Sequence, residues 1–586
     1  MKISVSMITY NEENKLEKTL KSVYNWVDEI VIVDSYSSDK TVEIAKKYGA
    51  KVYIEDWKGF GKQKNSALEK CTGDWILLID ADEEITENLR DEILNIINSD
   101  KIEKNVYKIP RISWWFGKKT HEKDSVIRLV KKDSGKYNEK EVHEEFVTKE
   151  NIGVLKNSIN HYTYVSLEEY FMKFNKYTTL AALELRKKGR KFNLGRLFFE
   201  PIRNFLKIYI GKKGILEGYY GFLRAILSGM YGIVRYSKLY LLEKENPNIL
   251  ISRTDKIGDL VLSVPSFSKI RNMYPNAKIA ILVRNYNYDI VKNLPYIDEV
   301  IKIDDYSEKE LIKKIRKFNA NIFIALFTNK FIGKLSIKSK AKYRIGPYSK
   351  LHSFFSYNKG VFQKRSKSIK NEAEYNLDLI KRVDGKLFYN SKDGESKIYL
   401  GESNKKLAEK FYVEKRINKK LKTIVIHPFS GGSAKNLTIE QYIELIKRIK
   451  QELDINVVVT GGIGDKAKID YFRKKIIDVN YFIGKRSILD LAAIINKGDI
   501  FIGSSTGPTH IAGILGKDIV AIYPKIKAQS KIRWGVLGNG KVEYIEPEEN
   551  CKEKYKCNEK CEYYDCFSKI KLEKIVIKIK KIIDEE

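Results

Sequence analysis

Cysteine is scarce in this chain of 586 residues: only five are present, and Cys71 stands alone. So few cysteines do not make a disulfide framework for the whole protein, and a reducing compartment fits the composition. The other four lie close together near the end of the chain, without any C-x2-C pair. They leave two alternatives open, a Zn²⁺ site or free thiols in a packed tail. These four are Cys551, Cys557, Cys561 and Cys566.

Long hydrophobic runs are also missing. No stretch of about eighteen uncharged apolar residues occurs, so we expect no membrane-spanning helix. The first residues, MKISVSMITYNEEN, lack the apolar segment of a signal peptide. We therefore expect a cytoplasmic protein.

Acidic residues are too few to balance the basic ones, with 76 Asp and Glu against 109 Lys and Arg and a formal charge of +33. Such a balance suggests an anionic partner: nucleic acid, an anionic membrane or a phosphorylated substrate. Frequent Lys, Ile, Asn and Tyr would equally follow from A/T-rich codons, so only local clusters of charge count as functional.

One local cluster is clear. Residues 186–244 contain fourteen Lys or Arg and three Glu, interleaved with Phe and Tyr in a helical pattern. Cationic and aromatic residues mixed on helices suit the surface of an anionic bilayer. The alternative is a helical collar packed on a catalytic domain with solvated charges. No recognised nucleic-acid-binding motif is present, and we expect no nucleic-acid partner.

The chain is of the α/β class. Strand-like runs at 3–9, 29–35, 51–55 and 75–79 alternate with helical segments, which predicts a parallel sheet covered on both faces. The alternation stops near residue 167, restarts after Pro247 and restarts again at residue 422. Two consecutive α/β halves predict two facing domains with a cleft between them. Ligands of such sheets bind beyond the carboxyl ends of the strands.

Paired acids follow the strand at 75–79. Asp80 and Asp82 are spaced so that both carboxylates can turn toward one ion, and hard oxygen ligands suit Mg²⁺ or Mn²⁺. A departing nucleoside diphosphate develops negative charge that such a cation stabilises. The alternative is a solvated acidic turn.

Polar residues also close the neighbouring strands and the segment before the acids. Asp34 and Asp39 suit contacts to a nucleoside base or ribose, although Asp39 could equally be the N-cap of the next helix. The segment 61–65 suits a phosphate contact or a role in holding the loop. The residues assigned to donor binding here are Asn11, Glu12, Asp34, Asp39, Lys64 and Asn65.

The motifs TYNEE, VDSYSSDKT, KQKN and DADE follow one another in this order between residues 9 and 83. With them the segment resembles the family 2 glycosyltransferases of GT-A fold, in particular the branch that adds glucose to the lipopolysaccharide inner core. The resemblance implies inverting transfer from a nucleotide sugar, with the divalent metal at Asp80 and Asp82. It also implies a general base in VHEE, where we favour Glu144 over Glu145. His143 is a metal ligand or a polar support.

Three further motifs lie in the later α/β halves. RTDKIGDL, with Asp259, joins a strand to a helix, and HPFSGG precedes Lys435. SSTGPTHIA starts another helix after a Gly-containing turn. Backbone N–H groups and the dipole of such a helix would stabilise a leaving diphosphate without a metal.

These three motifs resemble the family 9 glycosyltransferases, the heptosyltransferases of GT-B fold. The resemblance implies metal-independent, inverting transfer of heptose from ADP-heptose, with Asp259 as the base and Lys435 as a phosphate contact. Ser505 stands where many members have Asp, so another hexose or heptose stays open as the donor sugar. The donor site would include Ser505, Thr506, Gly507 and His510.

We therefore predict four segments: a GT-A domain at 1–165, a basic helical extension at 166–246, and two Rossmann-like halves of a GT-B domain at 247–415 and 416–586. The predicted protein transfers a hexose and a heptose to a lipid-linked saccharide on the inner face of the cytoplasmic membrane. Two alternatives stay open. Either one domain alone is catalytic and the other binds the acceptor, or the chain is a basic membrane-binding scaffold without activity.

Overall fold

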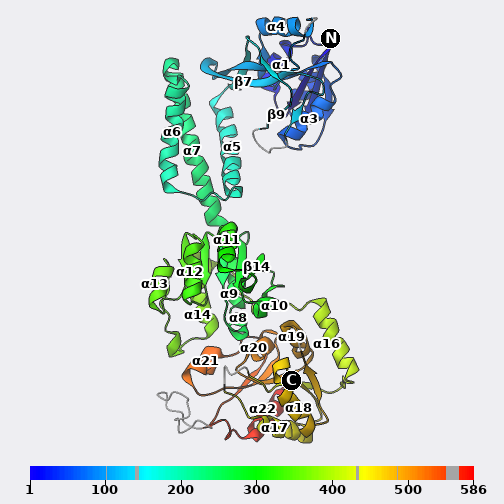
Figure 1. The fold of residues 1–586 in the computed structure, drawn as a ribbon, viewed down its shortest axis with the longest axis vertical. Coiled ribbons are helices and arrows are strands. Elements are labelled where there is room, and N and C mark those ends of the chain that lie inside the picture. Colours follow the sequence, from blue (N-terminus) through cyan, green and yellow to red (C-terminus); the bar gives the residue numbers. More distant parts are fainter. Residues whose placement is uncertain (100–101, 139–143, 431–434, 485, 549–565, 586) are drawn as a thin grey trace. The chain divides into compact units, whose positions relative to one another are not determined.

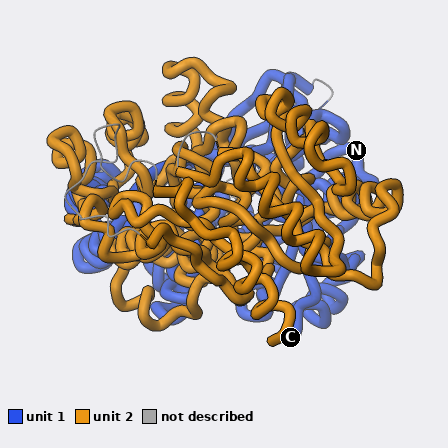
Figure 2. The backbone as a smooth tube through the Cα atoms, turned by 90° about the horizontal axis from the view of Figure 1, so that it is seen from below, with its two compact units in different colours: residues 1–241 blue, residues 242–586 orange. Residues whose placement is uncertain are grey.

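The computed structural model describes residues 1–99, 102–138, 144–430, 435–484, 486–548 and 566–585. The chain divides into two compact units, residues 1–241 and 242–586 (Figure 2). Each unit has cores of its own, built from the apolar strands that the sequence predicts.

The first unit begins with the expected parallel strands. They lie in the order β3-β2-β1-β4, and their buried apolar residues form the core of this unit, whereas β3 has no fully buried residue. The helices α1, α2 and α3 connect them, and α4 follows (Figure 1). The bounds are β1 Ile3–Thr9, α1 Glu13–Lys21, β2 Glu29–Asp34, α2 Thr41–Lys47, β3 Lys51–Ile54, α3 Phe60–Glu69, β4 Trp75–Leu78 and α4 Glu87–Ile97.

An antiparallel extension, which the sequence analysis did not anticipate, widens this sheet beyond β4. The long hairpin of β6 and β7 turns at Phe116 and Gly117, both with positive φ, as a two-residue hairpin turn requires. β7 pairs antiparallel with β4, and the sheet continues through β6 and β11 to β5. The bounds are β5 Glu83–Ile85, β6 Val106–Trp115, β7 Lys118–Lys131, β8 Lys136–Tyr137, β9 Phe146–Val147, β10 Ile152–Val154 and β11 Ile159–Tyr164.

Three helices follow the sheet, in the basic segment where helices were predicted: α5 Leu167–Lys187, α6 Leu194–Leu206 and α7 Tyr219–Glu245. Gly229 and Gly232 let α7 approach α6 closely, because a Cβ on either would lie 3.2–3.4 Å from the backbone of Pro201. α6 buries none of its residues completely. Within the described part of the chain, no helix is both long and apolar enough to cross a bilayer.

The second unit consists of two halves, each with a parallel sheet, as predicted for a GT-B fold. The first sheet has the order β14-β13-β12-β15-β16 and the second β19-β18-β17-β20-β21-β22. The strands are β12 Asn248–Ser252, β13 Lys278–Val283, β14 Glu299–Lys302, β15 Ile322–Ala325, β16 Tyr343–Ile345, β17 Thr423–His427, β18 Asn456–Gly461, β19 Asn480–Ile483, β20 Ile500–Ser504, β21 Asp518–Ile522 and β22 Val542–Ile545.

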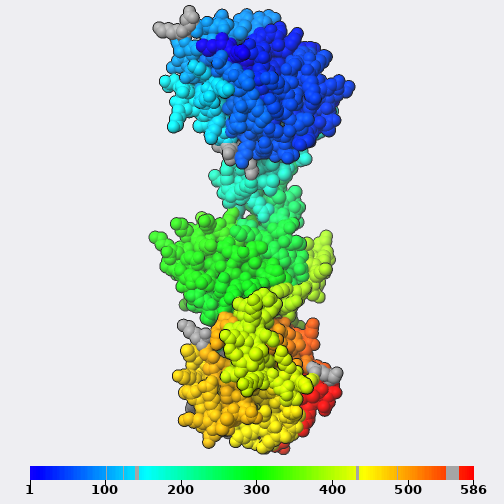
Figure 3. All heavy atoms as spheres, turned by 90° about the vertical axis from the view of Figure 1, so that its right-hand side faces the viewer, coloured from blue at the N-terminus to red at the C-terminus, as the bar shows by residue number. Residues whose placement is uncertain are grey.

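Helices cover both sheets and join the halves. α16 packs on α19 of the second half, and its yellow-green segment can be followed along the surface in Figure 3. A single apolar cluster includes Ile251 of the first half and Phe501 of the second. The main helices are α8 Ile257–Val261, α9 Val264–Met273, α10 Tyr288–Val291, α11 Glu308–Phe318, α12 Lys330–Lys338, α14 Glu372–Lys381, α16 Glu402–Glu414, α17 Ile439–Glu452, α18 Lys466–Lys475, α19 Ile488–Lys497, α20 Gly507–Ile514, α21 Lys531–Trp534 and α22 Leu572–Asp584.

Candidate active sites

The first candidate site lies at the carboxyl end of β4, where the loop to β5 carries Asp80. The Asp80 carboxylate is bound by the ammonium of Lys64 at 2.9 Å and by the guanidinium of Arg128. Burial alone would raise the pKa of Asp80, but these two cations outweigh it and hold the pKa well below its usual range. Asp80 is therefore a permanent anion whose nearest partners are basic side chains.

Glu144, the predicted general base, is joined to this cluster by Lys64. The Lys64 ammonium lies 2.9 Å from a carboxylate oxygen of Glu144 as well as from Asp80. Burial opposes the charge of Lys64, yet the Asp80 carboxylate outweighs it and raises the pKa of Lys64 above its usual range. The structure thus brings together three residues that come from α3, the β4–β5 loop and the segment before β9. His143 lies outside the described residues.

Asp82 faces a different partner, which the sequence analysis missed. The Nε2 atom of His161 on β11 lies 3.5 Å from a carboxylate oxygen of Asp82. Burial raises the pKa of Asp82, but the hydrogen bond and the charge of His161 together lower it by more, so the pKa lies below its usual value. Neighbouring ligand atoms of an octahedral first-row cation lie roughly 3 Å apart, which is close to the distance between these two atoms.

The donor set therefore fits Mn²⁺ or Mg²⁺ shared with a diphosphate. Among the described residues, no three His, Cys, Asp or Glu side chains converge as they do in a closed protein metal site. Mg²⁺-type sites commonly use one or two protein ligands and complete the shell with substrate phosphate oxygens and water. Burial and the charge of nearby Asp82 also raise the pKa of Glu12 to about 7, so a cation here would relieve repulsion between the acids.

The remaining predicted donor residues of this unit are tied into the scaffold. Asp34 is fully buried and accepts hydrogen bonds from Thr9 and Ser37, at 2.6–2.7 Å. Asp39 accepts the backbone N–H groups of Thr41 and Glu13, the first residues of α2 and α1, at 3.0 and 3.2 Å, although the N-cap position of α2 is Lys40. The sequence analysis had left a capping role of Asp39 open.

The side chains of Asn11 and Asn65 also form hydrogen bonds with the backbone of neighbouring loops. Asn11 has a positive φ of 53° and its side chain accepts the N–H of Ser38 at 2.8 Å. Asn65 exchanges two hydrogen bonds with the backbone of Tyr137, at 2.8 and 2.9 Å. These contacts fix the loops that carry the more exposed site residues.

The second candidate site is a pocket of about 290 Å³ in the second unit. It is lined by all three motifs that the sequence analysis singled out there: the start of α8, the loop after β17 and the start of α20. Its lining residues are Lys256, Ile257, Gly258, Tyr286, His427, Phe429, Ser430, Thr506, Gly507 and Pro508. Of the predicted residues, Thr506 and Gly507 line this pocket, whereas Asp259, Lys435, Ser505 and His510 are not among its lining residues.

Two glycines set the width of this pocket. A Cβ on Gly258 would lie 2.9 Å from the ring of His510, and a Cβ on Gly507 would lie 3.1 Å from Ile257. The starts of α8 and α20, one from each half, can approach each other only because both positions lack a side chain. At the start of α20, Pro508 has no N–H, and the N–H groups of Thr506 and Thr509 donate to the backbone oxygens of Ser504 and Thr506 at 2.7 and 3.1 Å. The N–H of Gly507, which lines the pocket, and the helix dipole are what this turn offers to an anion.

Asp259 follows the pocket-lining Gly258 on α8. One of its carboxylate oxygens lies 2.8 Å from Nη2 of the fully buried Arg253, a partner that the sequence analysis did not assign. The same guanidinium lies 2.8 Å from Asp255 through Nε. Burial, more than the opposing charge of Arg253, raises the pKa of Asp255 to about 7.

The other predicted donor residues surround the start of α20. Thr506 is buried and its hydroxyl lies 3.4 Å from that of Thr509, and Ser505 contacts the phenol of Tyr523. Lys435 lies in the loop between β17 and α17. Cys566 is partly buried, whereas Cys551, Cys557 and Cys561 lie outside the described residues, so the zinc alternative stays a prediction.

Two buried histidines are expected to make the second unit less stable in mild acid. Burial lowers the pKa of His427 and of His510 to about 4. Between pH 6.5 and 4 the unfolded chain therefore binds protons that the folded chain does not. The stability contribution is complete above about pH 6.5 and is lost as the pH falls toward 4. We expect a loss of about 2 kcal/mol per histidine between pH 7 and pH 5.

Urea unfolding at both pH values, followed by hydrogen exchange in peptides of β17 and α20, measures this loss. His427→Asn and His510→Asn should each reduce the pH dependence. His121→Asn, at a histidine that is half exposed in the first unit, is the control and should leave it unchanged. Equal pH dependence in all four proteins would contradict the assignment.

Comparison with known proteins identifies the family of each unit. The model of glycosyl transferase family 2 matches residues 4–163, and that of glycosyltransferase family 9 (heptosyltransferase) matches residues 311–564. A putative glycosyltransferase of Haemophilus influenzae is 32% identical over 294 residues, which cover 49% of this chain and 85% of that protein. The chain therefore belongs to the glycosyltransferases, with a family 2 domain followed by a family 9 domain.

Two further similarities are informative. The lipopolysaccharide core biosynthesis glycosyltransferase LpsC of Rhizobium meliloti is 30% identical over 262 residues, 42% of this chain and 96% of that protein. The crystal structure of a family 9 glycosyl transferase from Veillonella parvula covers 59% of this chain and 99% of its own, with 19% identity and a TM-score of 0.50. The latter similarity supports the fold of the second unit.

Proposed function

We propose that this glycosyltransferase is bifunctional and inverting, and that it acts on a lipopolysaccharide-core or similar lipid-linked saccharide. The first unit transfers a hexose, glucose in our assignment, from a UDP-sugar. The second unit transfers a heptose from ADP-heptose. The observation that supports the proposal is that Lys64 binds both Glu144 and Asp80 in the first unit, and that Asp259 follows Gly258, which lines a pocket with Thr506 and Gly507, in the second.

At the first site, Glu144 accepts the proton of the acceptor hydroxyl as the oxygen attacks the anomeric carbon. Lys64 orients Glu144 and shares its charge with Asp80. Asp82 and His161 would hold Mg²⁺ or Mn²⁺, which when bound supplies positive charge to the departing UDP. Asp80, which the sequence analysis paired with Asp82 as a metal ligand, is bound by Lys64 and Arg128, and we therefore assign the second protein ligand to His161. Because the base and the leaving group lie on opposite faces of the sugar, the anomeric configuration inverts.

At the second site, Asp259 accepts the proton of the acceptor hydroxyl, and the departing ADP needs no metal. The N–H of Gly507, the dipole at the start of α20 and the ammonium of Lys435 stabilise the developing charge on the diphosphate. The neutral state of His427 and His510, which follows from their lowered pKa, keeps these imidazoles available as hydrogen-bonding groups. This arrangement predicts activity in the presence of a chelator.

A donor screen on the full chain tests the proposal. UDP- and ADP-linked sugars are incubated with a lipid-linked core saccharide, with Mn²⁺ or with EDTA, and the products are read by mass spectrometry. We expect one hexose addition that requires the cation and one heptose addition that does not. If only one sugar is added under every condition, a single catalytic domain is supported. If no sugar is added, the scaffold alternative is supported.

The helical segment suits peripheral contact with an anionic membrane, and α6 is the part that supports this best. Phe198, Phe199 and Ile202 expose 63%, 74% and 57% of their surfaces, and Leu206 lies farther along the same helix. Basic residues, including Arg203 and Lys207, flank them. Apolar side chains beside cations are the arrangement of helices that bind at bilayer interfaces.

Removing the two phenylalanines should weaken vesicle binding. We expect Phe198→Asn with Phe199→Asn to reduce binding to phosphatidylglycerol vesicles at least about tenfold, since each buried Phe contributes roughly 1.5–3 kcal/mol. Flotation in a density gradient measures the bound fraction. Phe355→Asn with Phe362→Asn is the control, because these side chains in the second unit are 75% and 76% exposed. Equal loss in both double variants would contradict a specific role of α6.

A further inference from the structure

The base of the second site belongs to a buried ion network that extends into both halves of the unit. Arg253, at the end of β12, lies 2.8 Å from Asp259 and also binds the backbone oxygen of Leu326 and the amide oxygen of Asn376, both at 3.2 Å. These contacts hold the Arg253 guanidinium in a single position. A carboxylate held by such a guanidinium has a defined orientation in the cleft.

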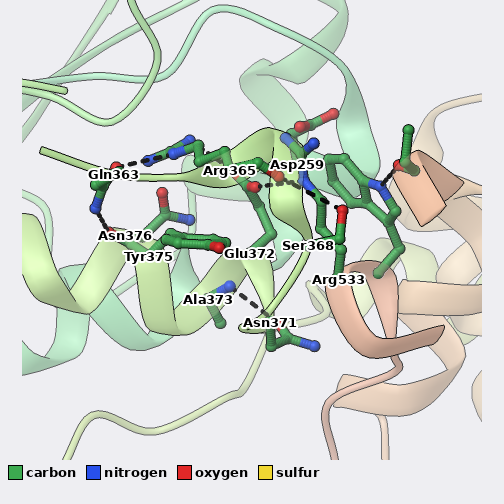
Figure 4. Close-up of polar contacts among 12 residues, drawn as sticks. Asp259, Gln363, Arg365, Ser368, Asn371, Glu372, Ala373, Tyr375, Asn376 and Arg533 are labelled. Atoms are coloured by element: carbon green, nitrogen blue, oxygen red, sulfur yellow. Dashed lines mark hydrogen bonds and ion pairs between the residues drawn. The ribbon is translucent and has the colours of Figure 1, made fainter. Parts of the chain in front are cut away.

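Glu372 stands at the centre of the network. Its side chain is almost fully buried at the start of α14, and one of its oxygens lies 2.6 Å from Arg365 and 3.4 Å from Arg253. The other oxygen lies 3.3 Å from Nε of Arg533. Figure 4 shows Glu372 between Arg365 and Arg533, with Asp259 close by. Three guanidiniums thus share one carboxylate.

Arg533 comes from the other half of the cleft. It lies on α21, in the half that carries α20, whereas Glu372, Arg253 and Asp259 belong to the first half. A second link lies beside it, because the side-chain amide of Asn371 donates to the backbone oxygen of Gly535 at 3.1 Å. The start of α14 is therefore bound to α21 at two neighbouring residues.

Stability alone is a weak explanation for this network. Buried ion clusters are often no more stable than apolar replacements of the same volume, since desolvation offsets the attraction. In the described structure Nη2 of Arg365 is buried without a hydrogen-bond partner, as are Oε1 of Gln529 and Oγ of Ser530 in the segment before α21. Unsatisfied groups at the contact between the halves indicate an arrangement that can change.

We propose that Glu372 is a positioning residue: through Arg253 it fixes the Asp259 carboxylate, and through Arg533 it makes that position depend on how the two halves meet. This inference rests on the proposed function, because it takes Asp259 as the base. As a consequence, the Asp259 carboxylate is correctly placed only when the donor half contacts the first half through Arg533. Proton transfer is sensitive to such placement, since an error of about 1 Å can cost about 100-fold in rate.

Kinetics of the full chain test the inference. Glu372→Gln keeps the shape of the side chain and removes its charge, and Arg533→Ala removes the link from the other half. We expect each to lower kcat of the ADP-sugar reaction about 10- to 100-fold, with less than about a threefold change in donor KM and in ADP affinity measured by calorimetry. Glu372→Asp should recover part of the rate. Arg271→Ala, which breaks the Arg271–Asp298 ion pair at 2.7 Å elsewhere in the same half, is the control and should retain the wild-type kcat.

Double variants separate positioning from a general structural effect. In the Asp259→Asn background, Glu372→Gln should cause no further loss, and Arg533→Ala should add little to Glu372→Gln, because all act through one group. Wild-type kcat in Glu372→Gln, or losses that multiply independently in the double variants, would overturn the inference. If Asp259→Asn itself transferred at the wild-type rate, the assigned base would be wrong, and this result is distinct from a failure of Glu372.

Discussion

Asp82→Ala is expected to reduce hexose transfer by the first unit about 1,000-fold while the second unit keeps its activity. The residue lies 3.5 Å from His161, and the pair supplies both protein ligands that we assign to the cation. Without Asp82 the charge that develops on the leaving diphosphate loses its cation. Loss of a single well-placed electrostatic contact of this kind costs about 100- to 1,000-fold.

The measurement is release of UDP from a UDP-sugar at increasing Mn²⁺. Asp82→Ala should need far more Mn²⁺ or show no response, and His161→Ala should show a smaller defect of the same kind. Asp91→Ala is the matched control, because this exposed acid of the same unit pairs only with neighbouring Arg90 among the ion pairs of the described residues. Unchanged turnover in Asp82→Ala would remove the metal assignment.

Asp259→Asn is expected to reduce heptose transfer by the second unit about 1,000-fold, and EDTA should have no effect on the wild-type reaction. Asparagine keeps the size of the side chain and its contact with Arg253, at 2.8 Å in the native chain, but it cannot accept the proton. General-base catalysis contributes about 100- to 10,000-fold, so the loss should fall on kcat.

Release of ADP from ADP-heptose in the presence of acceptor measures this rate. Asp289→Asn is the control, since Asp289 is a partly exposed acid on α10 that pairs with Lys292 on the same helix. Full activity of Asp259→Asn would contradict the assignment of Asp259 as the general base. Chelator sensitivity would contradict a reaction whose leaving group is stabilised by backbone N–H groups.

Much of the fold could be predicted because its strands are buried apolar runs. β1 has the predicted bounds, and β2, β3 and β4 each end one residue before the predicted end. Parallel strands covered on both faces are apolar throughout, so the sequence marks their ends clearly. β7 is rich in charged residues and β11 consists mostly of Asn, His, Thr and Tyr, so neither is an apolar run. For this reason the antiparallel extension was not recognised.

The candidate sites were predictable where the chemistry lies in one motif. Asp80, Asp82 and the segment around Gly507 could be found because turns at strand ends concentrate functional groups. Their partners could not, because Arg128 is 48 positions from Asp80 in the chain. Glu372 follows an Asn N-cap in the first turn of α14, where an acid is explained by the helix dipole alone. No local signal distinguishes it from such an acid.

In the second unit, the size of the cleft depends on two positions that lack a side chain, Gly258 and Gly507. An added methyl group at residue 258 would press against the imidazole at position 510, and one at residue 507 would press against an isoleucine side chain of the opposite half. Either methyl would require a shift of a few tenths of an ångström where the two halves meet. Alanine at these positions is thus a way to alter the size of the cleft by changes at two backbone positions.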